Sequence, residues 1–291
     1  MSTTTIPAGT KWWAGGRSPF NASYGKIMMW YFLMSDAFTF GAFLISYGTI
    51  RFSVNHWADP NQVFNAFPFA GHANLPLAFV SLMTFILIFS SVTMVLAVHE
   101  GHKMNRKGVE KFMIMTIIGG LAFLGCQAWE WTHMITGDHT VLADGILQTM
   151  GTTVTNNPWG VAADPAAITA ALQKTPDANL AAIVHSLGHG GTADAHAAAL
   201  SREQMISTIQ AANLHVTTPG PIAFGGYFFG ITGFHGFHVF SGVVINVIMY
   251  FKTKLGHFDQ RGHYEMIEKA GLYWHFVDLV WVFVFLCFYL V

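Results

Sequence analysis

Five long apolar runs, separated by more polar connections, dominate the pattern of hydrophobic and polar residues along the chain. Crossing a hydrocarbon layer of about 30 Å takes roughly 20 helical residues, and every run reaches that length. We therefore predict an all-α, polytopic bundle of five transmembrane helices, at residues 26–50, 76–98, 112–135, 221–251 and 272–291. The chain then divides into an amino-terminal segment, three helices, a long insert and two more helices, at residues 1–25, 26–135, 136–220 and 221–291.

Small residues recur at helical spacing within three of the runs, which is typical of helices whose backbones approach closely in a membrane. Gly226 and Gly230 form a GxxxG step in the fourth run, and Gly119 begins a similar stripe in the third. Tryptophans near predicted helix ends are expected at the membrane interfaces; they are Trp129, Trp131 and Trp274.

Basic residues are distributed unequally between the two sides of the predicted bundle. Eleven lie on the side of the amino terminus and only three, Arg51, Lys174 and Arg202, on the other. Because cytoplasmic segments carry the excess of Lys and Arg, we predict a cytoplasmic amino terminus and a carboxyl terminus outside. The 136–220 insert then lies on the extracytoplasmic side.

Composition narrows the class of protein further. Hydrophobic residues make up 53% of the 291 residues and charged residues only 10%, against about a quarter in ordinary soluble chains. The net charge of −1 provides no basic field for nucleic acid, so no such partner is expected. Cys126 and Cys287 fall inside apolar runs, and we expect neither a disulfide framework nor a zinc site. The first 25 residues do not resemble a signal peptide.

The insert is rich in Ala, Thr, Gly and His and carries more acidic than basic residues. Its part from Asp194 to Leu214 is compatible with a polar helix, and whether the insert folds by itself stays open. His185 and His189 stand four apart and His196 follows, a spacing that suggests a metal site. Glycines interrupt this stretch after His189 and no clear fourth ligand completes the set, so metal binding is the less favoured interpretation.

Ionisable residues inside the apolar runs are the most informative positions, because each is costly at membrane depth unless it is paired or functional. Asp36 lies near the predicted midplane of an otherwise apolar helix. Two pairs spaced i, i+3 share a helix face and fall, with Asp36, in the cytoplasmic half of the bundle, where they predict a polar cluster: His235 with His238, and His275 with Asp278.

Each of these positions also has a structural interpretation. A hydrogen-bonded packing network accounts for the histidines and Asp278 more simply than catalysis does. Glu130, near the outer end of the third helix, either joins such a network or reaches water or a lipid headgroup. For Asp36, which has no basic residue within a turn, a role tied to protons or lipid stands beside a structural one.

Four segments resemble, in order, the successive helix signatures of subunit III of haem-copper terminal oxidases. They cover residues 30–40, 127–131, 232–239 and 273–281, and read WYFLMSDAFTF, QAWEW, TGFHGFHV and YWHFVDLVW. Their order and their places on the helices agree across the membrane portion, and four motifs together are more specific than any one of them.

This resemblance implies a helical bundle flanking the catalytic subunit I, with subunit II as a further partner. Such a chain has no catalytic residue and binds no haem or copper, which belong to the partner subunits that reduce oxygen to water. It binds phospholipid, stabilises subunit I and sustains proton uptake. By the resemblance, Asp36 would be the carboxylate linked to proton entry and to lipid contact. The residues that hold the helices together and contact lipid headgroups would be Glu130, His235, His238, His275 and Asp278.

Three departures from the family pattern affect this interpretation. Many members have seven helices, and the expected five lack the first two, which help to form a lipid cleft. The intramembrane carboxylate is often Glu, whereas Asp36 resembles the shorter, quinol-oxidase-like forms. The 136–220 insert is unusually long, and its acidic balance suits a basic cytochrome domain. The short form without a transit peptide favours a bacterial inner membrane, and the electron donor, cytochrome c or quinol, stays open.

Two other classes of protein are alternatives. A membrane di-iron hydroxylase or desaturase needs several histidine boxes on one side of the membrane. Here the HxxxH step at His185 and His189 lies in the insert, far from His235 and His238. A small transporter with a midplane carboxylate would show a broken helix or an inverted repeat, and neither is visible in the sequence.

Overall fold

The computed structural model describes residues 23–55, 57–58, 60–64, 76–136, 138–151, 160–187, 200–212, 214 and 216–290. Five helices in this part of the chain are long and apolar enough to cross a membrane, which confirms the predicted all-α bundle. They are α1 (Tyr24–Ser53), α3 (Pro76–His102), α4 (Arg106–Thr136), α8 (Ile222–Lys254) and α10 (Glu265–Phe285), the last continued by a π-helical turn over Leu286–Leu290.

The helices extend beyond their apolar runs into polar sequence. α4 begins at Arg106 and α10 at Glu265, six and seven residues before the predicted starts. Hydropathy marks the length inside the hydrocarbon, whereas the backbone hydrogen bonds of a helix continue into water. As a result Trp274 lies well inside α10 and is fully buried in the bundle. The prediction that Trp274 is an interfacial side chain is therefore wrong.

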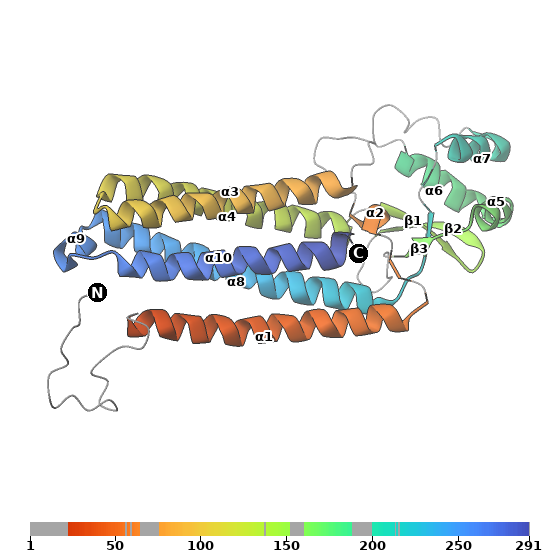
Figure 1. The fold of residues 1–291 in the computed structure, drawn as a ribbon. Helices are drawn as coiled ribbons and strands as arrows, with labels where there is room; N and C mark the ends of the chain where they lie inside the picture. Colours follow the sequence, from red (N-terminus) through yellow and green to blue (C-terminus); the bar gives the residue numbers. More distant parts are fainter. Residues whose placement is uncertain are drawn as a thin grey trace.

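α3, α4, α8 and α10 pack together as a four-helix bundle, and α1 lies along its outside against α8 and α10 (Figure 1). The buried residues of α1 are Leu33, Phe40 and Tyr47. Their spacing of seven residues makes a single narrow seam, since it returns to one side of the helix every two turns. The rings of Tyr47 and Phe288 lie 4.2 Å apart in this seam, so aromatic contacts hold α1 to the bundle.

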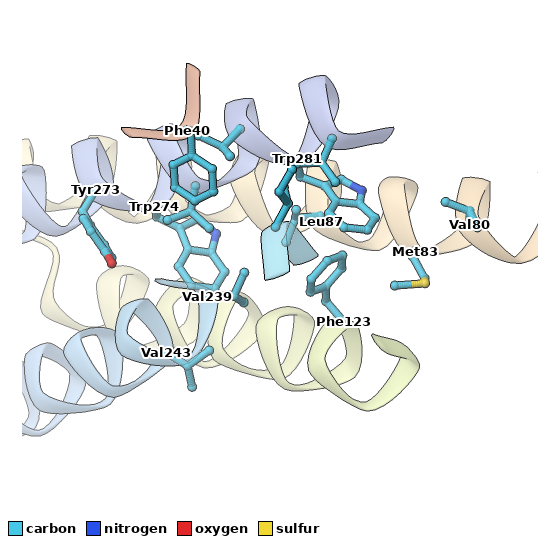
Figure 2. Packing of buried hydrophobic residues seen from close by; sticks show 14 of the residues in the cluster. Phe40, Val80, Met83, Leu87, Phe123, Val239, Val243, Tyr273, Trp274 and Trp281 are labelled. Atoms are coloured by element: carbon cyan, nitrogen blue, oxygen red, sulfur yellow. The ribbon is translucent and has the colours of Figure 1, made fainter. Parts of the chain in front are cut away.

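Two tryptophans of α10 fill the centre of the four-helix bundle (Figure 2). Trp274 and Trp281 are fully buried. Their indole N–H groups donate to Ser90 Oγ at 3.2 Å and to Thr84 Oγ1 at 3.1 Å, both on α3. Each large ring thus fills the core with its polar atom satisfied, as a buried tryptophan requires.

Glycines allow α4 and α8 to approach Trp274. A Cβ atom at Gly120 would lie 2.6 Å from the Trp274 ring, and one at Gly242 would lie 2.9 Å from it. By contrast, a Cβ atom at Gly226 or Gly230 would meet nothing within 4 Å. Within the described residues, the predicted close packing is confirmed at Gly119, where a Cβ atom would lie 2.8 Å from Ser90 of α3, and it also occurs at Gly120 and Gly242. The GxxxG step contributes nothing to it.

The 136–220 insert contains a small α/β unit at one end of the bundle (Figure 1). Its four-stranded sheet has the order β2-β1-β4-β3, in which β1 pairs antiparallel with β2 and parallel with β4, and β3 pairs antiparallel with β4. The elements are β1 (Asp138–Ala143), β2 (Ile146–Gly151), β3 (Val161–Ala162), α5 (Pro165–Lys174), α6 (Asp177–Leu187), α7 (Arg202–Ala211) and β4 (Val216–Thr218).

The α/β unit has a hydrophobic core of its own, built around side chains such as Leu147, Leu180 and Ile183. Asp144 and Gly145 connect β1 to β2 with positive φ angles of 53° and 75°, the conformation that an Asp-Gly hairpin turn favours. The predicted polar helix corresponds to α7, which Ser201 caps through a capping box. The first part of that prediction lies outside the described residues, and the sheet was not predicted.

The connections of the bundle lie at two opposite ends (Figure 1). The start of α1, the α3–α4 connection and the short helix α9 (His257–Arg261) share one end. The α/β unit, the short helix α2 (Pro60–Val63) and the end of α10 share the other. The basic loops are thus grouped as the sequence predicts, and the cytoplasmic location of that end stays a prediction.

We predict that Gly120→Ala destabilises the bundle by about 1–3 kcal/mol, because the added methyl group overlaps the Trp274 ring and forces a core rearrangement. Gly125→Ala is the matched control, since Gly125 lies on the same helix with nothing within 4 Å of the added atom. Alanine there should stabilise by up to about 1 kcal/mol through helix propensity. Thermal unfolding of the purified chain in detergent measures both, and equal midpoints would contradict the prediction.

Candidate functional site

Asp36 of α1 meets His238 of α8 within the membrane portion. The Asp36 Oδ2 and His238 Nε2 atoms lie 2.8 Å apart, and the two side chains are only 14% and 9% exposed. The rings of Phe40 and Phe234 pack against the imidazole, with centroids 5.4 and 4.6 Å from it. The partner that Asp36 lacks within a turn of α1 is therefore supplied by another helix, in an aromatic surrounding.

A backbone contact orients the His238 ring. Its Nδ1 lies 2.8 Å from the Phe234 carbonyl oxygen, which only accepts, so Nδ1 carries a hydrogen. Nε2 then faces Asp36 Oδ2 at 2.8 Å, although the contact does not have the geometry of a hydrogen bond. A carboxyl group and an imidazole, both of which can exchange protons, are thus in contact within the membrane portion.

A groove of about 740 Å³ opens between α1 and α10 beside this pair. Its walls are almost entirely apolar, with Trp30 and Met34 on α1 and Leu272 and Phe276 on α10. Toward the end of α1, Lys26 Nζ forms an ion pair with Glu268 Oε1 at 2.7 Å. The groove offers apolar surface along its length and charged groups near one end, which is the distribution that a phospholipid requires.

Glu130 lies inside the bundle and is only 1% exposed. The Tyr289 hydroxyl donates to both carboxylate oxygens, at 3.2 and 3.0 Å, and Gln127 Nε2 donates to Oε2 at 3.1 Å. The carboxyl group thus faces protein donors and does not reach water or a lipid headgroup. It connects α4 to the last turn of the chain.

His235 and His275 have separate surroundings. His235 is fully buried, and its Nε2–H donates to the Val277 carbonyl oxygen at 3.1 Å. His275 is half-buried, and its Nδ1 lies 2.6 Å from Ser91 Oγ on α3. Asp278 lines the same α3–α10 surface as His275.

The structure divides the predicted polar cluster into three parts. Asp36 and His238 meet between α1 and α8, His235 is enclosed in the core, and His275 and Asp278 lie at the α3–α10 surface. Residues that sequence reasoning missed are Ser91, Gln127 and Tyr289. Only Gln127 had a local signal, its spacing of three from Glu130, because Ser91 and Tyr289 belong to other helices.

The metal hypothesis for the insert falls largely outside the described residues. His185 lies in α6, and the structure does not describe His189 and His196. Within the ranges that the structure describes, no group of three His, Cys, Asp or Glu side chains is arranged to hold a metal ion. The chemistry that the described ionisable side chains offer is proton binding at Asp36 and His238 and hydrogen bonding elsewhere.

Comparison with known proteins points to one family. A family model described as cytochrome c oxidase subunit III matches residues 196–291. Cytochrome c oxidase subunit 3 of Marchantia polymorpha is 47% identical over 66 residues, 23% of this chain and 24% of that protein. The protein of the same name from Heterololigo bleekeri is 40% identical over 85 residues, 28% of this chain and 32% of its own length.

The matched segments span about a quarter to a third of these relatives. The family match includes α8 and α10 with two of the four signatures, at 232–239 and 273–281, whereas Asp36 and Glu130 lie outside it. Asp36 nevertheless contacts His238 within the matched part. On the family match and these relatives, the carboxyl-terminal third of the chain, residues 196–291, is similar to the cytochrome c oxidase subunit III family of haem-copper oxidases.

Proposed function

We propose that this multi-pass membrane protein is the non-redox subunit III of a proton-pumping haem-copper terminal oxidase. Oxidase subunits I and II would carry the haems and copper and reduce oxygen to water, while this chain stabilises subunit I. The observation that supports the proposal most is the Asp36–His238 contact at 2.8 Å. It joins a carboxylate outside the family match to a histidine inside it, so two of the four signatures meet in the structure.

The second part of the proposal is a role in proton uptake and lipid binding. The Asp36–His238 pair brings a carboxyl group and an imidazole into contact within the membrane portion, so it is suited to relay or buffer protons for subunit I. The adjacent groove between α1 and α10 has the size and apolar lining for acyl chains. The other polar side chains would hold the helices in place. Asp36 in place of Glu supports a bacterial inner membrane as the location.

A pull-down of the tagged full-length chain from native membranes in mild detergent tests the assignment. We expect larger partner chains, the reduced-minus-oxidised bands of haem a or haem o, and copper in the purified material. A colourless chain that carries two irons would instead establish the di-iron hydroxylase alternative. A colourless, metal-free chain that transports a solute after reconstitution would establish the transporter.

Asp36→Asn tests the proton role. The amide cannot exchange a proton with His238, so we expect an assembled complex whose sustained turnover over many cycles falls by about twofold or more. Asp36→Glu is the matched control, because it keeps the carboxyl group and should retain turnover. Oxygen consumption is recorded over many cycles alongside the haem content of each variant. Unchanged sustained turnover in Asp36→Asn would contradict the role.

The α/β unit is proposed to dock a basic cytochrome domain, on the basis of its exposed acidic residues. The triple variant Asp144→Asn, Asp164→Asn, Glu203→Gln removes three exposed charges and keeps side-chain size. If a basic cytochrome is the electron donor, its KM should rise roughly two- to tenfold at low ionic strength. High salt provides the control, since screening should remove the difference from wild type. An unchanged KM at low salt would contradict the docking proposal.

A further inference from the structure

A second groove, of about 610 Å³, runs between α3 and α10 on the outside of the bundle. Its walls are apolar, and its polar residues are Ser91, His275 and Asp278. His275 and Leu279 line both this groove and the one beside α1, so one ridge of α10 separates the two. Nothing in the proton and lipid roles proposed above uses the polar residues of this second groove.

Asp278 is the unusual residue of the groove. It is only 9% exposed, yet neither carboxyl oxygen has a hydrogen-bond partner among the described residues. The nearest donor group is the Ser91 hydroxyl, which also lies 2.6 Å from His275 Nδ1, and its single hydrogen leaves at least one carboxyl oxygen of Asp278 without a donor. An unpaired buried carboxyl group is costly, and in a membrane such groups almost always find a partner. The groove therefore presents hydrogen-bond acceptors that lack a donor.

The depth of Asp278 limits what the donor can be. The carbonyl oxygen of the neighbouring Val277 accepts from His235, which stands thirteen residues after the first of the 33 residues of α8 (Ile222–Lys254). Asp278 therefore lies near the middle of the bundle, and the headgroups of phospholipids lie toward the two ends. Acyl chains reach this depth but carry no donor. The missing donor must come from a molecule that carries polar groups through the middle of the membrane.

The surface around Asp278 has the form of a helix-packing face. On α3 the exposed side chains of Ile88, Val92 and Val95 are spaced i, i+4, i+7, which aligns them along one face over two turns. Val282 and Phe283 flank the groove from α10 and are about half exposed. Helices in membranes associate through apolar packing of this kind, with polar side chains hydrogen-bonded across the interface.

We propose that the α3–α10 groove seats a transmembrane helix of a partner subunit, which presents a hydrogen-bond donor side chain to Asp278. The proposal rests on the proposed function, since it takes the partner from the same oxidase complex. Hydrogen-bond complementarity selects the occupant. The groove supplies an acceptor near the middle of the bundle, and a spanning helix with a Ser, Thr, Tyr, Trp or Asn side chain supplies the donor there. Ser91 and His275 line the groove beside Asp278 and offer further hydrogen-bonding groups to the same partner helix.

Site-specific photo-crosslinking in native membranes tests the occupant. A photoreactive phenylalanine analogue replaces Val92 in the groove, and the matched control replaces Phe240, which is 55% exposed on α8. We expect the Val92 probe to label one transmembrane segment of a co-purifying subunit, identified by mass spectrometry, and the Phe240 probe not to label that segment. Adducts at Val92 with lipid, quinone or a second copy of this chain would each overturn the proposal, as would equal labelling from Phe240.

Substitution of Asp278 tests the hydrogen bond itself. Asp278→Leu should weaken retention of the crosslinked subunit in detergent about three- to tenfold, the range of one membrane hydrogen bond, while Asp278→Asn, which still accepts, should retain it. Asn246→Leu is the control, because Asn246 is a buried polar residue of α8 that also lacks partners among the described residues. It should leave retention unchanged. Full retention in Asp278→Leu would overturn the proposal.

The outcomes separate this proposal from the proposed function. If haem and copper co-purify with the chain but the Val92 probe labels only lipid, the docking proposal fails and the oxidase assignment stands. If the probe labels a transmembrane helix of a subunit that carries no haem and belongs to no oxidase, the interface stands and the oxidase assignment fails.

Discussion

A polar side chain in the hydrocarbon layer has no water to bond, and in this protein several of the most deeply buried ones find a partner on another helix. Asp36 on α1 meets His238 on α8, Glu130 on α4 meets Tyr289 at the end of α10, and the indoles of α10 donate to hydroxyls on α3. Each contact satisfies a costly group and also sets the rotation of one helix against its neighbour. The arrangement of the bundle depends on this requirement as much as on apolar packing.

The attachment of α1 to the bundle combines a narrow apolar seam with one polar contact to another helix. Its buried seam consists of Leu33, Phe40 and Tyr47, and most of the helix faces outward. The contact between Asp36 and His238 lies beside that seam, in the aromatic contacts of Phe40 and Phe234. Because α1 touches the bundle along one line, the α1–α10 groove opens beside it. The helix that carries the proton-binding carboxylate therefore also forms one wall of the proposed lipid site.

The α3–α10 surface differs from the rest of the bundle in one respect. Most buried polar side chains described above have a partner within the chain. Asp278 and Asn246 have no well-formed hydrogen bond among the described residues, and Asp278 lines the outer groove whereas Asn246 is 1% exposed within the bundle. A chain that acts alone would leave that cost uncompensated. The proposed place of the chain in an oxidase complex would supply a physical reason for it, because a subunit interface is completed by another polypeptide.

The sequence by itself determined the helices and their order, because the length of an apolar run follows from the thickness of the hydrocarbon layer. It also located Asp36, Glu130, His235, His238, His275 and Asp278 as costly residues, and four ordered motifs indicated the family.

The tertiary structure decided which of these polar residues are partners. His235 and His238 share a helix face by spacing, but one donates to the Val277 carbonyl and the other meets Asp36. Trp274 was predicted at an interface and lies in the core, because α10 starts earlier than its apolar run. The sheet of the insert was likewise unpredicted, since its pairing joins short strands far apart in the chain, such as Thr140 with Val216. Hydropathy and spacing are local properties, whereas hydrogen-bond partners and strand pairing are chosen by residues distant in sequence, and only the folded chain brings these together.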